Sequence, residues 1–416
     1  MAPQRQSDPA QFVLALNSGS SSIKFALFRV GPPLERALTG KLERVGLPDG
    51  ELTVMDAATG KREQRAVFTP NHAACVRPLV EVLGSKVSFS AVRAIGHRVV
   101  HGGLRYRTTQ RVTSEMIAEL RRFSQFVPDH LPSGIMLIEA IGREYPQVSQ
   151  VACFDTAFHR DMPRVAKLLP IPRRYDAEGI QRYGFHGLSY AYLMEELERA
   201  AGAAAARGRV VLAHLGNGAS MAAVRDGKCM DTTMAFTPAA GLVMSTRPGD
   251  LDPGLFTYLA RAKGMTGEQF HQMINKQSGL LGVSETSPDM RDLLARESTD
   301  VRAAEAVAVF CYHAKRWIGA LAAALGGLDT LVFAGGIGEN AAVIRARICD
   351  GLGFLGIELD PARNEANSPV ITNDRSRVAV RVIRTDEELH IAKSVVKVLG
   401  METGVESQPA TNREMP

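Results

Sequence analysis

Apolar runs and polar turns alternate along the chain, and this pattern predicts strands near its start. Residues 12–16 are continuously apolar and residues 23–30 are largely so, and the polar turn between them predicts a hairpin. The same arrangement returns at residues 209–214 and 221–224, again around a small polar turn. Further strands are expected within residues 31–70 and at residues 91–100, 151–154, 330–334 and 378–384.

Apolar residues at three- to four-residue spacing predict helices elsewhere. In residues 303–325, Cys311 and Trp317 are interpreted as core residues. Ser114 is placed to cap one helix, and the Ser287-Pro288 pair is placed to open another. Helices are expected at residues 114–125, 134–145, 188–206, 253–262, 267–277, 289–296 and 303–325, after a turn at 335–340, and in a last segment that ends near residue 399. The alternation of strands and helices predicts an α/β fold.

The two hairpin turns share a composition that suits phosphate. The first holds Asn17, Gly19 and four serines, and the second contains Gly216, Asn217 and Gly218. Small side chains let a phosphate chain approach backbone N–H groups, and the amide oxygen of Asn17 suits a Mg²⁺ shell. Serine and glycine are also ordinary turn residues, so one copy alone indicates little. The second copy indicates an internal duplication, with two half-molecules that each open on such a hairpin.

Composition narrows the class of protein. With 416 residues two domains are expected, and a net charge of +5 without a long basic run disfavours nucleic acid and suits a small anionic substrate. The five cysteines lie far apart and form no CxxC motif, which fits a reducing cytoplasm. The opening apolar run is too short for a secretory signal, and His313, Lys315 and Arg316 disfavour a membrane span in the helix that carries them.

A nominal dinucleotide motif provides a rival hypothesis. The segment from Gly336 to Ala341 fits G-x-G-x-x-A after a predicted strand, and Glu358 lies near the spacing of a ribose-binding acid. These residues would suit an NAD-dependent dehydrogenase. The motif lies late in the chain, however, with too few residues after it for a doubly wound domain. We therefore favour a loop against which an adenosine lies.

Four other residues suggest chemistry. Arg98 follows a predicted strand and Arg247 lies in a turn, where a guanidinium fork matches carboxylate or phosphate oxygens in pairs. His186 lies in a glycine-flanked turn that leaves its ring accessible, and Asp155 ends a predicted strand at the junction of the halves. Three of them have a stated structural alternative: an ordinary salt bridge for either arginine, and a turn or N-cap role for Asp155.

Together these motifs resemble the acetate kinases, of the acetate and sugar kinase, Hsp70 and actin superfamily. The resemblance is carried by residues 17–25, 97–103, 154–159, 183–187, 214–218, 246–254, 289–291, 335–340 and 385–389. It implies two duplicated ribonuclease H-like domains of the actin and Hsp70 type, with an active-site cleft between them. Residues 1–156 with the C-terminal helix in 387–416 would form the acyl and Mg²⁺ side, and residues 157–386 would bind the nucleotide.

The resemblance also implies a reaction: reversible, direct in-line transfer of the ATP γ-phosphoryl group to acetate, giving acetyl phosphate and ADP. Mg²⁺, with Mn²⁺ as a substitute, is the implied metal, ATP and ADP are the co-substrates, and a homodimer is the implied assembly. The implied catalytic residues are Asp155, His186, Arg247 and Arg98, and the acyl site would comprise Arg98, Val100, His130, Phe185 and Pro238. ATP would contact Lys24, His214, Leu215, Gly216, Asn217, Gly218, Asp289, Met290, Arg291, Gly336, Ile337, Gly338, Glu339 and Asn340. The metal would lie near Asn17 and Glu387.

Two points of mechanism and substrate stay open. A carboxylic acid with a pKa near ~4 is already ionised at neutral pH, so Asp155 is expected to orient Arg98 or a metal-bound water rather than act as a base. Asp129 stands where the family usually has a pocket leucine, which leaves propionate or another short acid as the alternative substrate. An ATP-switched module without enzymatic activity also shares the superfamily core, but Arg98, His186 and Arg247 argue against it, because a switch needs no carboxylate clamp.

Overall fold

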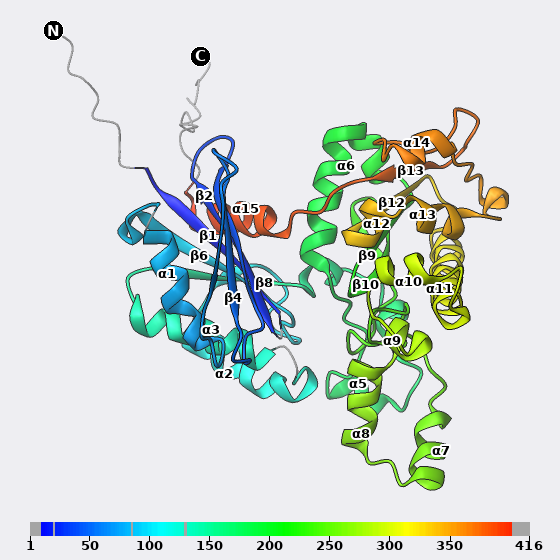
Figure 1. Ribbon diagram of the computed structural model, residues 1–416, viewed down its shortest axis with the longest axis horizontal. Coiled ribbons are helices and arrows are strands. Elements are labelled where there is room, and N and C mark those ends of the chain that lie inside the picture. The colour runs from blue at the N-terminus through cyan, green and yellow to red at the C-terminus, as the bar shows by residue number, and fades with distance from the viewer. Residues whose placement is uncertain (1–9, 20, 85, 129–130, 402–416) are drawn as a thin grey trace, which may run out of the picture. The chain divides into compact units, whose positions relative to one another are not determined.

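The chain divides into two compact units in the computed structural model, which describes residues 10–19, 21–84, 86–128 and 131–401 (Figure 1). The first unit comprises the described residues of Met1–Val99, Thr108–Cys153 and Glu388–Pro416. The second unit comprises Val100–Arg107 and Phe154–Glu387. Residues 100–107, which the sequence analysis assigned to the first domain, therefore belong to the second unit.

The sheet of the first unit has eight strands in the order β5-β4-β3-β2-β1-β6-β8-β7. They are β1 (Phe12–Ser18), β2 (Ser22–Arg29), β3 (Glu35–Glu43), β4 (Glu51–Asp56), β5 (Arg62–Ala66), β6 (Val92–Val99), β7 (Gln110–Arg111) and β8 (Ser149–Phe154). The predicted first hairpin is confirmed: β1 and β2 pair in antiparallel register, with Asn17 opposite Lys24. On its other edge β1 pairs with β6 in parallel.

Helices cover both faces of this sheet. They are α1 (Val76–Gly84), α2 (Ser114–Phe123), α3 (Leu131–Glu144) and the C-terminal α15 (Glu387–Leu399). Ile95 of β6 belongs to the apolar core that α1 and α3 complete. Its neighbour Gly96 points to the opposite face, because side chains alternate along a strand. A Cβ at Gly96 would lie 2.4 Å from Ile391 and 2.6 Å from Val395, so the missing side chain is what lets α15 approach β6.

The second unit repeats this plan with five strands in the order β11-β10-β9-β12-β13. They are β9 (Val210–Leu215), β10 (Ala219–Arg225), β11 (Lys228–Thr232), β12 (Thr330–Ala334) and β13 (Ala379–Val382). In both sheets a run of antiparallel strands, β5 to β1 in the first and β11 to β9 in the second, ends at a strand that pairs in parallel with its other neighbour, β1 with β6 and β9 with β12. The predicted internal duplication is therefore visible in the topology, and the second hairpin is confirmed.

Two long helices sandwich the second sheet. Tyr190, Leu193 and Leu197 of α6 (Gly187–Arg207) pack on Val210 and Leu212 of β9. Helix α11 (Val301–Leu325) packs against β9, β10 and β11. The remaining helices are α4 (Arg164–Lys167), α5 (Arg173–Ala177), α7 (Gly254–Lys263), α8 (Gly267–Gln272), α9 (Gly279–Ser284), α10 (Met290–Arg296), α12 (Gly335–Asn340), α13 (Ala342–Cys349) and α14 (Pro361–Glu365).

Several local predictions are wrong. The N-cap of α2 is Thr113, whose side chain accepts from the Met116 N–H, and not Ser114. The N-cap of α10 is Asp289, and not the Ser287-Pro288 pair. The expected helix at 267–277 stops being α-helical at Gln272 and continues as a π-helical turn, Met273–Gln277. Residues 335–340 form a short helix rather than a turn. Helices α1, α4, α5, α9 and α14 and strands β7 and β11 were not predicted.

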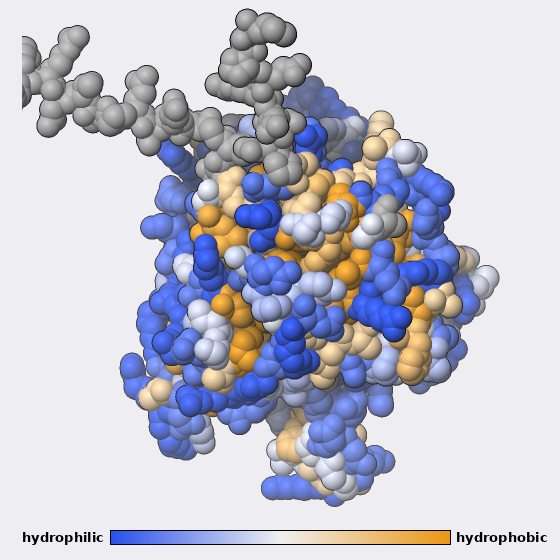
Figure 2. All heavy atoms as spheres, turned by 90° about the vertical axis from the view of Figure 1, so that its left-hand side faces the viewer, coloured by the Kyte–Doolittle hydropathy of each residue, from blue (hydrophilic) through white to orange (hydrophobic). Residues whose placement is uncertain are grey.

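The surface is mostly hydrophilic but includes apolar side chains. On the face drawn in Figure 2, apolar areas lie between hydrophilic ones. Phe68 is the most exposed large apolar residue of the first unit among the described residues, at 73%. In the described part of the chain, no helix combines the length and the apolar character that a membrane span requires. All five cysteines are buried free thiols.

Candidate active site

In the first unit, the predicted metal and carboxylate residues meet at the end of β1. The Asn17 side chain lies between two charged groups: Arg98 Nη1 donates to its Oδ1 at 3.4 Å, and its Nδ2 donates to Glu388 Oε1 at 3.0 Å. The structure thus brings together Asn17, Arg98 and Glu388. Glu388 follows Glu387, the residue that the family resemblance places near the metal.

The turn after Asn17 is tied down by backbone bonds. The Gly19 N–H donates to the Ser22 carbonyl at 2.7 Å, and the buried His72 ring bonds the Gly19 carbonyl through Nε2 at 2.9 Å. Ser20 lies outside the described residues. Arg98 follows His97, which is buried and bonds Gln150 Oε1 through its Nε2 at 2.8 Å. Burial lowers the pKa of His97 to about 4, so this ring is a neutral structural group.

In the second unit, the predicted phosphate turn joins β9 to β10. Its backbone closes on itself, because the Gly216 N–H donates to the Gly218 carbonyl at 3.1 Å, and the Ser245 N–H holds the Asn217 carbonyl at 3.1 Å. A Cβ at Gly218 would lie 2.9 Å from Arg247 Nη2 and 3.2 Å from His186 Nε2. Arg247 and His186 therefore converge on this turn, and a glycine there leaves the space between them open.

His186 occupies a specialised backbone position. It precedes α6 in the left-handed region, with φ of 57°. The next residue, Gly187, donates its N–H to the Asp155 carbonyl at 2.9 Å, and a Cβ on Gly187 would lie 2.0 Å from that oxygen. On the preceding side, a Cβ on Gly184 would lie 2.6 Å from the ring of His159. Through this hydrogen bond the turn holds His186 next to the backbone of Asp155, the other predicted catalytic residue of this segment. The Asp155 side chain is buried.

The ring of His159 supports the same turn from inside the protein. Its Nε2 bonds the Phe185 carbonyl at 3.0 Å, and its Nδ1 lies 3.1 Å from Cys229 Sγ. An Nε2–H that donates to Phe185 leaves Nδ1 to accept from the Cys229 thiol. Burial lowers the pKa of His159 to about 4 and raises the pKa of the Cys229 thiol, so both groups stay neutral.

Two histidine rings stack beside the phosphate turn. The His186 and His214 ring centroids lie 4.5 Å apart with planes inclined by 26°. His186 Nδ1 lies 2.8 Å from Ser220 Oγ, and His214 Nδ1 lies 2.9 Å from Ser189 Oγ. Ser189 in turn bonds Thr385 Oγ1 at 2.8 Å. Sequence reasoning missed these supporting hydroxyls, although Ser220 lies only two residues after the phosphate turn.

The predicted arginine and acyl residues of this unit are also connected. Arg247 Nη1 donates to the Pro238 carbonyl at 2.6 Å, so the predicted pocket residue helps to aim the guanidinium. Phe185 is buried, and the centroid of its ring lies 5.8 Å from the centroid of the His101 ring. Val100 is buried as well. Asp129 and His130, the other residues considered for the acyl pocket, lie outside the described residues.

The predicted adenosine residues form two groups. Helix α12 starts at Gly335, where a Cβ would lie 2.7 Å from the Leu215 carbonyl, so α12 packs on the end of β9. The Glu339 carboxylate accepts from the Gly335 N–H at 2.9 Å and from the Thr385 N–H at 3.0 Å, and it therefore fastens α12 to the Thr385 segment. Asn340 Nδ2 donates to the Gly336 carbonyl at 2.9 Å.

The second adenosine group lies at the start of α10. Asp289 caps this helix, and Arg291 binds the same carboxylate through Nη2 at 2.6 Å. This contact lowers the pKa of Asp289. Met290 between them is buried against the protein, while the Arg291 side chain is 89% exposed. Lys24 on β2 is exposed in the first unit.

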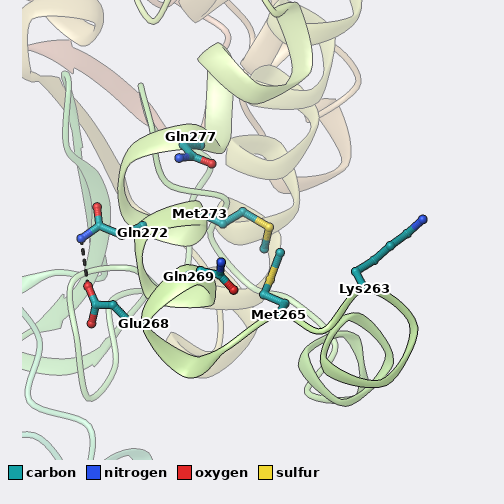
Figure 3. A pocket seen from close by; sticks show the side chains of 7 residues that line it. All are labelled: Lys263, Met265, Glu268, Gln269, Gln272, Met273 and Gln277. Atoms are coloured by element: carbon teal, nitrogen blue, oxygen red, sulfur yellow. Dashed lines mark hydrogen bonds between the residues drawn. The ribbon is translucent and has the colours of Figure 1, made fainter.

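A separate hollow of about 330 Å³ lies at α7, α8 and the π-helical turn (Figure 3). Its lining consists of Lys263, Met265, Glu268, Gln269, Gln272, Met273 and Gln277. In Figure 3 the two methionine side chains extend toward each other, and a Gln272–Glu268 hydrogen bond of 3.1 Å closes one side. None of its lining residues was predicted as a site residue, and the hollow lacks the paired cations that phosphate binding requires.

A duplicated actin-like sheet, with a glycine turn on which Arg247 and His186 converge, is typical of a kinase, a phosphotransferase. A solved acetate kinase from Porphyromonas gingivalis shares the fold: its TM-score is 0.86 at 36% identity, with 94% of this chain and 100% of that chain covered. The model of the acetokinase family matches residues 12–393. The chain belongs to the acetokinase family.

Curated relatives agree with this assignment and include two substrate names. An acetate kinase from Methylocella silvestris is 44% identical over 93% of this chain and 98% of its own length. A propionate kinase from Citrobacter rodentium is 41% identical over 94% of this chain and 98% of its own length. The predicted family and fold class are thus confirmed. The dehydrogenase hypothesis is wrong, because β9, β10 and β11 are antiparallel and α12 belongs to an actin-like sheet rather than a doubly wound one.

Proposed function

We propose that this kinase transfers the γ-phosphoryl group of ATP to acetate, reversibly and in line, giving acetyl phosphate and ADP. The observation that carries the proposal is the convergence of Arg247 Nη2 and His186 Nε2 on Gly218 in the phosphate turn. Phosphoryl transfer is catalysed chiefly by positioning and by neutralising charge on the equatorial oxygens. Two hydrogen-bond donors beside an open glycine turn are suited to that task.

The residues of the second unit divide this work. In the turn from Gly216 to Gly218, the backbone N–H groups that follow Gly216 would contact the nucleotide phosphates, since the Gly216 N–H itself closes the turn. Arg247, aimed by the Pro238 carbonyl, would pair with oxygens of the phosphoryl group in transfer. His186 would donate a further hydrogen bond to that group. The α12 segment and residues 289–291 would hold the adenosine, with Met290 supplying a buried support.

Two residues of the first unit, Arg98 and Asn17, are assigned to the acid and to the metal. Arg98, hydrogen-bonded to Asn17, would orient the carboxylate of the substrate. The acid needs no general base, since it is ionised at neutral pH with a pKa near ~4. Asp155 is therefore assigned an orienting role in this proposal, as the sequence analysis expected.

The donor set near Asn17 fits Mg²⁺ with a mostly water and phosphate shell. It offers one amide oxygen and one neighbouring carboxylate, that of Glu388, with Glu387 adjacent in sequence. Within residues 10–19, 21–84, 86–128 and 131–401, no group of three or more His, Cys, Asp and Glu side chains is arranged to hold a metal. Such a sparse set suits Mg²⁺, which keeps several waters and binds through one or two carboxylates plus phosphates. When bound, Mg²⁺ or Mn²⁺ would neutralise phosphate charge.

The test is a hydroxylamine-trapping assay with ATP, MgCl₂ and acetate, in which acyl phosphate appears as hydroxamate. We expect a signal that requires all three components. Arg247→Ala should lower kcat by about 10²–10³-fold, the usual cost of removing one donor that stabilises transition-state charge. Arg261→Ala, which removes an exposed arginine of α7, is the matched control and should leave kcat unchanged. Absence of hydroxamate with every short acid tested would refute the proposal.

Propionate is the second candidate acceptor, favoured by the propionate kinase relative at 41% identity. One methylene changes transition-state binding by about 1–3 kcal/mol, or 10–200-fold. We propose that kcat/KM is higher for acetate than for propionate or butyrate. The reverse order, measured in the same assay, would assign the chain a longer acid.

Assembly and location complete the proposal. We propose a homodimer, as the family resemblance implies, and sedimentation equilibrium of the purified protein would detect a monomer if this is incorrect. We also propose a cytoplasmic location, supported by five buried free thiols, which are typical of a reducing compartment. Fractionation of the source cells tests this directly.

A further inference from the structure

We propose that Ser220 and Tyr190 are positioning residues that hold His186 as its Nε2–H tautomer, so that His186 acts as a neutral hydrogen-bond donor. The inference deepens the proposed function, because the phosphoryl group would receive that hydrogen bond. Its basis is a three-residue relay: Tyr190 Oη hydrogen-bonds Ser220 Oγ, and Ser220 Oγ lies 2.8 Å from His186 Nδ1.

The relay is built into rigid elements. Tyr190 lies on the first turn of α6, Ser220 is the second residue of β10, and His186 precedes α6 in its left-handed conformation. Tyr190 and Ser220 are both fully buried, with 0% exposed surface. The Tyr190 ring belongs to the apolar core formed with Leu193 and Leu197. The hydroxyl groups therefore have fixed positions, and their protons must find acceptors within the protein.

Counting protons decides the direction of the relay. Among the described residues, Ser220 Oγ is the recorded hydrogen-bond partner of the Tyr190 hydroxyl. If Tyr190 donates to Ser220 and Ser220 donates to His186 Nδ1, every proton has an acceptor and the imidazole proton lies on Nε2. If Nδ1–H donates to Ser220 instead, only one of the two hydroxyl protons can lie within the Tyr190–Ser220 bond, so the proton of the other hydroxyl is left without an acceptor in this relay. A buried donor without an acceptor costs its full desolvation, so the first direction is favoured.

The phenol is suited to a fixed donor role. Burial raises the pKa of Tyr190 well above its usual range, so its proton is retained at every pH at which the protein is folded and active. Two titratable or charged groups lie beside the His186 ring: His214 of β9 stacks on it at 4.5 Å between ring centroids, and Arg247 shares the space beside Gly218. A neutral His186 next to the Arg247 cation avoids like-charge repulsion while its Nε2–H still points toward the phosphate turn.

The first test is kinetic. Tyr190→Phe removes one oxygen and keeps the ring. It should lower kcat about tenfold, while the KM values for ATP and for the acid stay within about twofold of wild type. That combination is expected when an interaction is made only in the transition state. Ser220→Ala should have at least the same effect, and Ser220→Thr, which restores a hydroxyl, should recover part of the rate. Tyr312→Phe removes the same atom from an exposed tyrosine of α11 and serves as the unchanged control. Wild-type kcat in Tyr190→Phe, or a change confined to KM, would overturn the proposal.

The second test reads the tautomer itself. In protein labelled with ¹⁵N-histidine, the His186 signals are identified by their loss in His186→Gln. We expect an Nε2–H tautomer in the wild type and a mixture in Tyr190→Phe. An Nδ1–H tautomer in the wild type would overturn the proposal even if Tyr190→Phe failed to fold. If instead no short acid is phosphorylated but the Nε2–H tautomer is found, the proposed acceptor fails while the relay stands.

Discussion

Replacing Gly187 by alanine tests how the His186 turn is held. The new Cβ would lie 2.0 Å from the Asp155 carbonyl oxygen and 2.9 Å from Phe158 Cβ, whereas real Cβ atoms stay beyond 3.0 Å. The turn must therefore move by about one ångström, and the Gly187–Asp155 hydrogen bond is strained or lost. Overpacking costs about 1–3 kcal/mol, and the lost bond adds about 1 kcal/mol.

These magnitudes give two expected results. In the second unit, to which Gly187 belongs, a loss of about 2–4 kcal/mol in the free energy of unfolding lowers the thermal midpoint by roughly 4–16 °C. Misplacing a catalytic group by one ångström lowers kcat by about 100-fold, and this loss should be measured well below the thermal midpoint. Calorimetry and the hydroxamate assay supply both readouts.

The matched control is Gly319→Ala in α11, where the added Cβ would meet nothing within 4 Å. Because alanine favours helix more than glycine by about 1 kcal/mol, this control should be as stable as the wild type or more so. If Gly187→Ala matched Gly319→Ala in both midpoint and kcat, the idea that close backbone contact fixes the position of His186 would be refuted.

Three further outcomes follow from buried groups. Arg345 is fully buried and donates to the Gly338 and Glu339 carbonyls of α12 at 2.9 and 3.0 Å. Arg345→Met should therefore loosen α12, lower the thermal midpoint, and raise the KM for ATP more than the KM for the acid. An unchanged KM for ATP would argue against a role for α12 in adenosine binding. Burial lowers the pKa of His97 and of His159 from 6.5 to about 4, so the unfolded chain binds protons at these residues before the folded protein does. The free energy of unfolding should therefore fall as the pH drops from 6.5 towards 4, by at most about 3 kcal/mol for each residue. A denaturation midpoint that does not change over this pH range would contradict the assignment of both rings as neutral. Burial raises the pKa of the thiols, to about 12 for Cys75. A thiol reagent at pH 8 should therefore leave all five cysteines unmodified in the native protein and react with all five after denaturation. Rapid labelling of the native protein would show that the core opens.

The sequence was sufficient for the elements whose signal is local. The hairpins around Asn17 and Asn217 were predicted because apolar strands and small polar turns leave few alternatives, and both are present. Helix caps were predicted less well, since Thr113 and Ser114 are both competent caps. Thr113 has the extended backbone that lets its side chain reach the Met116 N–H, and the sequence pattern does not show which of the two residues adopts it.

Tertiary contacts explain the larger misses. Residues 335–340 contain three glycines, which disfavour a helix, yet α12 forms because Glu339 accepts from the Gly335 and Thr385 N–H groups and Arg345 binds its last carbonyls. One tertiary contact of the candidate site was not predicted. The start of α15 brings the Glu388 side chain to Asn17, and the sequence pattern gave no signal for that pairing.

The packing of α15 against β6 at Gly96 has a consequence for protein synthesis. Residues of β6 leave the ribosome long before Ile391 and Val395, which cover the Gly96 face of that strand. The Gly96 face of β6 therefore stays uncovered by α15 until nearly the whole chain has been made. A ribosome that stalls before α15 would release a chain whose N-terminal unit, although fully translated to β8, still exposes a surface prone to aggregation.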